Sequence, residues 1–400
     1  MRNNTPALRF YLISAIFGGL YAVVDQLVDV IAKKTLHASP LIVTFLTMLP
    51  SMSLLFSVFV LHIAEQFPNQ KRVLQYMAFF GRFSFVIFLF YIDIPVYLII
   101  LTASYITFTL FNPMLNTFLS TTFTPSTRGK YVGYAMSIMA LVAVVFSRIS
   151  GTLMDKDSSI TSLILAIGGV GGCLAILIAS IPFKQTYRDR TKKQPNPFTS
   201  MIAILKKDPV FLKFELYFYV YGIAFMIILP AIPLYLVDNL RLNYTEISTA
   251  KVLIPQFFII VLAPFVGKLH DRTTPQRFSG LSFLILSSYP LILGCASFFT
   301  PSTALVFVYA SYIMYGIAMI GVSFAWNIST IELAKHGSPQ QYQAIHITLT
   351  GIRGLIIPPL GYLLLRLIPI NYIFFISCIL FITAGILMLR VRHENHPLEN

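Results

Sequence analysis

The stretch KQTYRDRTKKQPNPFTSMIAILKK, residues 184–207, is the only long polar segment of the chain and separates two apolar regions of similar length. It carries seven Lys and Arg residues against a single acid, Asp189. A basic segment between two apolar regions is typical of a cytoplasmic linker, because Lys and Arg concentrate in the cytoplasmic loops of membrane proteins. The sequence therefore predicts four parts: a first half at 1–183, the linker at 184–208, a second half at 209–391 and a cytoplasmic tail at 392–400.

Composition indicates that most of this chain lies in lipid. Of its 400 residues, 56% are hydrophobic and 11% are charged, whereas a soluble domain has about 25% charged residues. A soluble core cannot hide so much apolar surface. The net charge of +14 is spread over many loops, which favours membrane topology over nucleic-acid binding. The three cysteines lie in apolar runs without metal or redox spacing, so we expect no cofactor and no metal site.

Twelve apolar runs are long enough to cross a bilayer, which takes about 20 residues. Inside lipid the backbone must satisfy its own hydrogen bonds, so each run predicts a helix. The expected fold is an all-α integral membrane protein with two pseudo-symmetric bundles of six helices. The expected spans are 9–31, 40–62, 72–92, 95–120, 132–154, 160–183, 209–236, 247–267, 278–299, 303–330, 343–366 and 370–390.

The distribution of Lys and Arg predicts the orientation. With the N-terminus in the cytoplasm, twenty of the 29 bases fall in cytoplasmic segments, five in outer loops and four within spans. This bias favours cytoplasmic termini at both ends under the positive-inside rule, in a protein of the plasma membrane.

Matching positions indicate that the two halves are copies. Asn116 and Tyr131 are separated by the same number of positions as Asn327 and Tyr342. Internal repeats of this kind are common in transporters.

The segment GKLHDRTTPQR, residues 267–277, resembles the signature loop of the major facilitator superfamily, G-x-L-x-D-R with a following base. Gly267, Leu269, Asp271 and Arg272 match that pattern, whereas Thr274 stands where a second Gly is usual. The resemblance implies a transporter of twelve helices in two halves that works by alternating access. Arg128-Gly129-Lys130 is similar to the basic loop of the family before the fifth span.

A weaker copy of this loop, HIAEQFPNQKR, lies in the first half at residues 62–72. It keeps an acid and two bases but has Leu61 in place of the Gly. The resemblance implies that both copies take part in the conformational change. The expected residues of these loops are Glu65, Lys71, Gly267, Asp271, Arg272 and Arg277.

Charged residues inside the expected spans are candidates for a gate. A charge at the centre of a membrane helix costs roughly 2.5–3.5 kcal/mol, so each needs a partner or water. Asp25 and Asp29 share a face of the first span, and Arg148 and Lys251 lie at a similar depth on the fifth and eighth spans. We expect Asp25 or Asp29 to pair with Arg148, with Lys251 approaching from the other half. Such a cluster could couple protonation to opening of the outer side. The alternatives are a static ion pair that fixes the packing of the helices, or residues that water reaches at the outer mouth.

Polar residues on other spans are candidates for substrate binding. The resemblance implies that the fourth and tenth spans line a central cavity, and Gln256 lies beside Pro255 on the eighth. Arg353, near the middle of the eleventh span, either meets an anionic substrate group or bonds to neighbouring carbonyls. The expected binding residues are Asn112, Asn116, Gln256, Trp326, Asn327 and Arg353.

Prolines within two spans predict interrupted helices. Pro230 and Pro233 in the seventh span, and Pro358 and Pro359 in the eleventh, should kink or break their helices. Discontinuous helices often accompany transport sites.

The expected function is a secondary active transporter of a small organic solute, coupled to protons. Acids on the first span resemble those of proton-coupled members of the family, including multidrug exporters, which makes an amphipathic compound or drug a candidate cargo. The alternative is a facilitator or uptake symporter for a metabolite. The chain is expected to act as a monomer whose partners are its solute, protons and the lipid bilayer.

Two other classes of function are weighed against transport. An intramembrane lipid-modifying enzyme would use Asp25 and Asp29 as a magnesium pair, but the second half offers no further acids at matching positions. A receptor with a transport fold is not separable by sequence. No Gly-rich nucleotide loop with Lys-Ser/Thr is present, so ATP is not expected to drive the protein.

Overall fold

The computed structural model describes residues 5–64, 67, 69–183, 197–270, 272–335 and 339–391. Within these residues every regular element is a helix, and no strand is present. The expected all-α fold class is confirmed.

Apolar helices of membrane-spanning length make up most of the described chain. Eleven of its helical segments are long and apolar enough to cross a bilayer. The twelfth apolar helix is α2, Pro40–Ala64, which occupies the second expected span. Eleven of the twelve expected spans are therefore helices of spanning length, and the second is an apolar helix whose described apolar part, Pro40–Phe56, is shorter.

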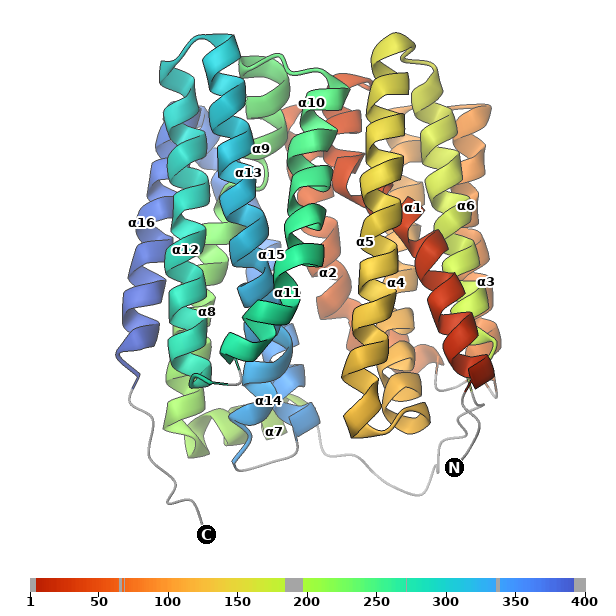
Figure 1. The fold of residues 1–400 in the computed structure, drawn as a ribbon, viewed down its shortest axis with the longest axis vertical. Coiled ribbons are helices and arrows are strands. Elements are labelled where there is room, and N and C mark those ends of the chain that lie inside the picture. Colours follow the sequence, from red (N-terminus) through yellow and green to blue (C-terminus); the bar gives the residue numbers. More distant parts are fainter. Residues whose placement is uncertain are drawn as a thin grey trace. The chain divides into compact units, whose positions relative to one another are not determined.

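The first compact unit contains the six helices before the linker and a later segment, residues 232–260. Within it α1 packs against both α5 and α6, and α2 and α3 pack against α4 (Figure 1). Its elements are α1 (Thr5–Lys34), α2, α3 (Gln70–Gly81), η1 (Phe83–Leu89), α4 (Ile94–Thr122), α5 (Pro125–Lys156), α6 (Ile160–Ser180), η2 (Tyr235–Asn239), α10 (Tyr244–Ser248) and η3 (Thr249–Leu253), with most of α9 (Ala231–Leu234) and the start of α11 (Ile254–His270).

The second unit contains residues 192–231 and 261–400. Here α12 packs against α13 and α16, and α8 packs against α15 and α16. A short helix, α7, lies within the segment expected to be a linker. The elements are α7 (Pro197–Lys207), α8 (Pro209–Ile227), α12 (Pro275–Cys295), η4 (Ala296–Phe298), α13 (Pro301–Phe324), η5 (Ala325–Ser329), α14 (Thr330–Glu332), α15 (Pro339–Leu367) and α16 (Ile370–Leu389), with the larger part of α11.

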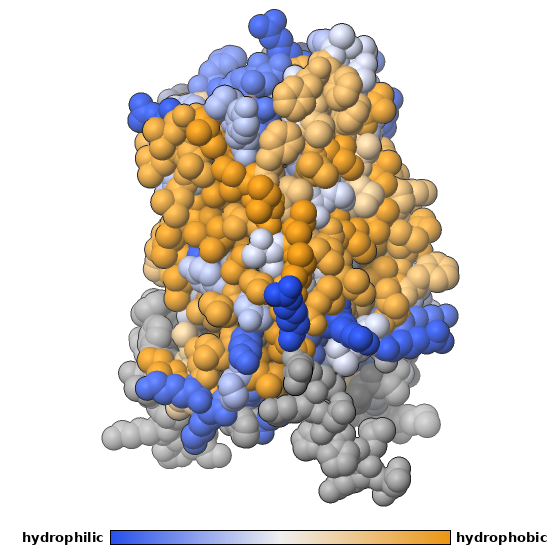
Figure 2. Space-filling view, turned by 90° about the vertical axis from the view of Figure 1, so that its left-hand side faces the viewer, coloured by the Kyte–Doolittle hydropathy of each residue, from blue (hydrophilic) through white to orange (hydrophobic). Residues whose placement is uncertain are grey.

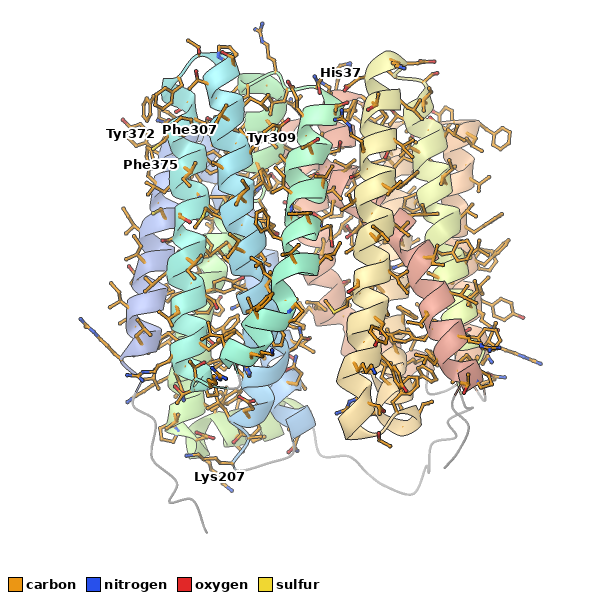
Figure 3. All side chains as sticks on the ribbon, viewed as in Figure 1. His37, Lys207, Phe307, Tyr309, Tyr372 and Phe375 are labelled. Atoms are coloured by element: carbon orange, nitrogen blue, oxygen red, sulfur yellow. The ribbon has the colours of Figure 1, made fainter. Side chains whose placement is uncertain are left out.

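The surface of the second unit has the polarity of a membrane protein. Figure 2 shows apolar residues over the middle of one face and hydrophilic residues at both ends. Figure 3 places Lys207 at one end of this unit and Tyr309 and Tyr372 at the other. Tyr is enriched where membrane meets water, and Lys is enriched in cytoplasmic loops. The side of the membrane on which each end lies stays a prediction.

The two proline pairs have different effects. The helix of the seventh span ends at Ile227, and a new helix begins at Ala231 directly after Pro230, as the sequence predicts. In contrast, α15 continues as one helix through Pro358 and Pro359, so the expected break is absent there. Membrane helices tolerate proline because neighbouring helices and local adjustments satisfy the freed backbone groups.

The contact-defined units do not follow the linker. Residues 232–260, which lie after the linker in the sequence, pack with the first unit. The division into halves at 1–183 and 209–391 therefore stays a prediction, and the tail at 392–400 lies outside the described residues.

Candidate functional site

An ion pair between Asp29 and Lys251 lies at the centre of the candidate gate in the first unit. The Lys251 ammonium is 2.7 and 2.8 Å from the two Asp29 carboxylate oxygens. The two side chains are 16% and 9% exposed. Asp29 lies near the end of α1, and Lys251 lies on the π-helical element η3. π-helical turns are rare and are frequent at functional sites. The position of Lys251 on such a turn, together with its buried charge, therefore makes this pair a candidate functional site.

Asp25 lies one helical turn before Asp29 and is held by a tyrosine of α4. The Tyr105 hydroxyl donates a hydrogen bond of 2.8 Å to an Asp25 carboxylate oxygen. Two further hydroxyl contacts connect α1 to α4, from Tyr97 to the carbonyl oxygen of Val28 and between Tyr21 and Ser104. The two acids lie one turn apart on α1, as the sequence predicts. Asp29 contacts the Lys251 ammonium, and Asp25 accepts a hydrogen bond from the Tyr105 hydroxyl.

The end of α1 is fastened to the segment that begins the eighth span. Lys33 forms an ion pair of 2.9 Å with Asp238 on η2. Lys34 donates to the carbonyl oxygen of Leu242 at 2.8 Å, and the Thr35 hydroxyl is hydrogen-bonded to that of Tyr244. These contacts and the Asp29–Lys251 pair all join α1 to residues 232–251. We name them, together with the Asp155 contacts described next, the α1–α10 clasp.

Asp155, at the end of α5, caps the N-terminus of α10. Its two carboxylate oxygens accept backbone N–H bonds from Tyr244 at 2.6 Å and Thr245 at 2.8 Å. The first N–H groups of a helix have no partner within the helix, and its dipole attracts an anion there. Next to this cap α5 and α10 pack closely, because a Cβ added at Gly151 would lie only 2.4 Å from the Ser248 hydroxyl oxygen.

Sequence reasoning missed most of the α1–α10 clasp. Lys33, Lys34 and Asp155 lie just outside the expected spans 9–31 and 132–154, where water can solvate a charge and no partner is needed. One signal was present, because Asn243 and Glu246 have capping-box spacing, and both reciprocal hydrogen bonds exist in the structure. A helix start at Tyr244 with unsatisfied N–H groups could therefore have been predicted, but not the acid that meets them.

The expected pairing of an α1 acid with Arg148 is not the one that the structure contains. Arg148 lies exposed on α5, and no ion pair of its side chain is present among the described residues. Spacing along a helix gave the depth of this residue but not the direction of its side chain. Lys251, expected only to approach the cluster, is instead the partner of Asp29.

The substrate candidates of the first unit do not form a cluster. Asn112 on α4 and Gln256 on α11 are half-buried, and Asn116 is exposed. No hydrogen bond joins these three side chains within the described residues. Their role in binding stays a prediction.

Arg353 lies deep in the second unit. It is 2% exposed, and its guanidinium donates to the carbonyl oxygen of Phe218 at 2.7 Å and to the Thr350 hydroxyl at 2.8 Å. It also lies over the Phe218 and Tyr219 rings. Of the two roles that the sequence left open, this geometry matches a base bonded to neighbouring backbone, and a substrate contact stays a prediction.

A second buried acid–base pair joins α8 to α15. The Nδ1 atom of His346 is 3.0 Å from both carboxylate oxygens of Glu215, and both side chains are buried. The Trp326 ring lies edge-on to this imidazole, with the centroids 5.5 Å apart. Asn327 is exposed and donates to the carbonyl oxygen of Ser323. The sequence signal was Glu215 itself, because an acid within an apolar run requires a partner.

The expected signature loops are described only in part. Glu65 and Asp271 lie outside the described residues. Lys71 donates to the carbonyl oxygen of Ile181 at 2.6 Å. A Cβ at Gly267 would lie 3.2 Å from the Phe324 ring, so α11 and α13 approach each other closely at this glycine. The other two loop residues, Arg272 and Arg277, are exposed.

Solved structures with the same fold are membrane transporters. A mutant of the peptide transporter POT, in complex with alafosfalin, aligns with a TM-score of 0.74 at 12% identity, covering 96% of this chain and 93% of that one. A mutant of the nucleoside transporter NupG gives 0.71 at 11% identity, covering 97% and 100%. A bacterial homologue of the human lysosomal transporter Spinster, inward-facing and unoccupied, gives 0.63 at 13% identity, covering 99% and 100%. A comparison with curated proteins finds no match.

The apolar helices define a multi-pass membrane protein, and the fold is the one that these solved structures share. The model of the Major Facilitator Superfamily matches residues 10–352, so the chain belongs to that family. The family expected from the sequence is thereby confirmed, and the protein is a transporter of a small molecule and not an enzyme.

Proposed function

We propose that this chain is a secondary active transporter coupled to protons, in which Asp25 and Asp29 carry the coupling. The observation that supports the proposal is the buried Asp29–Lys251 ion pair with Asp25 one turn away. A charge inside a membrane protein is expensive to keep, so an intramembrane acid is by default a candidate for proton transfer. The pair also joins two segments 222 positions apart in the sequence, so its state can affect the packing of both.

The proposed coupling step is the protonation of Asp29. A proton on this carboxylate removes the charge that holds Lys251 and leaves the ammonium partly buried without a counter-ion. That loss favours separation of η3 from α1, because an unpaired buried charge costs several kcal/mol. Asp25, held by the Tyr105 hydroxyl, then serves as the neighbouring acceptor for the same proton.

The α1–α10 clasp is proposed to be the gate that this step releases. Its contacts lie at the ends of α1 and α5, which the distribution of Lys and Arg assigns to the outer side. The proposal includes cytoplasmic termini in the plasma membrane and a clasp closed on the outer side. Protonation would open that side to the solute.

The cargo is proposed to be a small organic solute, with an amphipathic compound or drug as one class. Peptides and nucleosides extend the classes to be tested, because the neighbouring structures include transporters named for them. A facilitator that carries a metabolite without protons remains the competing function, and the α1–α10 clasp would then be purely structural.

The test measures proton release and thermal stabilisation when candidate solutes are added to the detergent-purified protein. The panel contains amphipathic drugs, sugars, amino acids, short peptides, nucleosides and organic acids. Release of protons with one class is the expected result, and Asp25→Asn and Asp29→Asn should reduce it. Arg148→Met is the matched control and should release protons as the unmodified protein does, because Arg148 lies outside the cluster. Thermal stabilisation without release by any solute would overturn the coupling.

A further inference from the structure

We propose that the second unit binds the headgroups of anionic phospholipids at a basic corner formed by Lys213, Arg277 and Arg390. These three bases are exposed, and they come from α8, α12 and α16, of which α16 packs against the other two (Figure 1). The partner is the negatively charged, phosphate-bearing surface of the bilayer around this end of the unit. The inference goes beyond the proposed function and does not depend on it, because lipid binding is measured without any solute.

Two arginines of the basic corner lie at the same level because α12 begins where α16 ends. A Cβ added at Gly280 would lie 2.9 Å from the Leu389 side chain, so the start of α12 touches the last turn of α16. Arg277 precedes Gly280 by three positions, and Arg390 directly follows Leu389. At about 1.5 Å per residue, each arginine lies within about 5 Å of that contact along its helix. The two exposed guanidinium groups therefore belong to one end of the packed pair.

The lysine of the basic corner reaches the same level on α8. The Ser377 hydroxyl of α16 donates to the carbonyl oxygen of Ala224 on α8 at 2.7 Å. Lys213 lies eleven positions before Ala224, and Arg390 lies thirteen positions after Ser377. These separations are about 17 and 20 Å along the helices. The two helices run in opposite directions, as the seventh and twelfth spans of an alternating chain must, so both separations lead to the same end of the unit.

Exposed acids are scarce at this end of the second unit. The described acids of the unit are Asp208, Glu215 and Glu332, and only Glu332 is exposed. In the part of the unit that the structure describes, no ion pair involves a base of the basic corner. A cluster of four to eight Lys and Arg residues beside a membrane helix is typical of binding to anionic lipid. The exposed bases of this end are Lys206, Lys207, Lys213, Lys268, Arg272, Arg277, Lys335 and Arg390.

The length of α16 places the basic corner at the depth of lipid headgroups. Tyr372, near the start of α16, is 54% exposed, and Figure 3 shows it at the end of the unit opposite Lys207. Exposed tyrosines are enriched where membrane meets water. From Tyr372 to Arg390 the helix advances about 27 Å, and the hydrocarbon core of a bilayer is about 30 Å thick. Arg390 therefore lies close to the opposite layer of headgroups, where phosphate groups are found.

Exposed apolar side chains next to these bases favour lipid over a soluble acidic partner. Leu212 and Leu216 flank Lys213 on α8 and are 44% and 56% exposed. Ile386 and Leu389 precede the last arginine of α16 and are 41% and 38% exposed. A phospholipid offers acyl chains to such residues and a phosphate to the bases beside them. The planar guanidinium also matches the geometry of a phosphate group, which a lysine does only as a point charge.

The experiment follows the thermal stability of the full-length protein in detergent as phosphatidylglycerol or phosphatidylcholine is added. The first lipid carries a net negative charge and the second carries none, so we expect phosphatidylglycerol to stabilise at the lower concentration. In Arg277→Gln with Arg390→Gln, the phosphatidylglycerol concentration for half of the effect should rise roughly thirtyfold, since each base near an anionic surface contributes about fivefold.

The matched control is Lys156→Gln with Arg366→Gln. It also removes two exposed bases, but from the ends of α5 and α15 that the distribution of Lys and Arg assigns to the outer side. The preference for phosphatidylglycerol should be unchanged in this control. Inorganic phosphate should not stabilise the unmodified protein, because the site is assigned to a lipid; stabilisation by phosphate equal to that by phosphatidylglycerol would overturn the assignment.

Salt provides a second test that does not depend on the folding of any variant. Between about 0.01 and 1 M salt the Debye length falls from about 30 to about 3 Å, so the preference of the unmodified protein for phosphatidylglycerol should disappear. Equal stabilisation by both lipids at low salt, or a preference that survives at high salt, would overturn the inference. A double arginine variant that keeps the full preference would overturn it as well.

Discussion

Removing the cation of the Asp29–Lys251 pair tests whether the α1–α10 clasp opens as a gate. In Lys251→Met the side chain keeps its length, and Asp29 keeps its charge in a place where it is only 16% exposed. Breaking a buried ion pair by removing one partner costs about 3–5 kcal/mol, and we take the lower end because both groups reach some solvent. About 3 kcal/mol corresponds to roughly a hundredfold change in the ratio of open to closed protein.

The assay is the rate at which a cysteine at position 248 reacts with a water-soluble alkylating reagent. Ser248 is 0% exposed and lies against Gly151, so it reacts only when α10 leaves α5. The three native cysteines are replaced beforehand. We expect Lys251→Met to raise the labelling rate roughly a hundredfold, because the rate follows the open population.

The double variant Asp29→Asn with Lys251→Met separates a gate from general damage. Replacing both partners of a buried ion pair by neutral groups of similar size is often close to neutral in stability. The labelling rate should therefore return to within about tenfold of the original, which corresponds to about 1.4 kcal/mol. An unchanged rate in Lys251→Met, or a double variant that labels as fast as the single one, would refute the reasoning.

Three further predictions concern packing and pH. Arg353→Met should lower the free energy of unfolding by about 3 kcal/mol, seen as reduced thermal stability in detergent, because a carbonyl and a hydroxyl lose a buried charged donor. Gly361→Ala should lower it by about 1–3 kcal/mol, since its Cβ would lie 2.2 Å from a backbone carbonyl oxygen of α8, whereas Gly133→Ala, with nothing within 4 Å, should not. A hydrogen bond from the Ser159 N–H lowers the pKa of Asp157, so protection of that amide against hydrogen exchange should be present at neutral pH and be lost as the pH falls through the lowered pKa. Asp157→Asn should remove this pH dependence; a loss of protection in the variant at the same pH would contradict the assignment.

Sequence reasoning recovered the architecture because the bilayer imposes it. The length of apolar runs predicts helices in lipid almost without reference to packing. The break before Ala231 was also readable, because Pro230 cannot continue a helix. The uninterrupted helix through Pro358 was not, since it depends on what the neighbouring helices supply.

The sequence predicted which residues belong to the candidate site but not which side chains pair with each other. Asp25, Asp29 and Lys251 were recognisable because charge inside an apolar run requires compensation. Their partners depend on the rotation of each helix about its axis, which put Arg148 on an exposed face and Lys251 on Asp29. The sequence did not single out His346, because an imidazole in an apolar run need not carry a charge that requires a partner. Glu215, the acid that it contacts, lies 131 positions earlier.

The separation of 222 positions between Asp29 and Lys251 has a consequence for how the protein is made. At about 5–20 residues per second, the ribosome needs roughly 10–45 s to produce the lysine after the aspartate. During that interval the first helix enters the bilayer with an acid whose cation does not yet exist. In a nascent chain that stops before the eighth span, Asp29 would have no Lys251 to compensate its charge. Such a truncated chain would then present an uncompensated intramembrane charge, a feature by which degradation machinery could distinguish it from the complete protein.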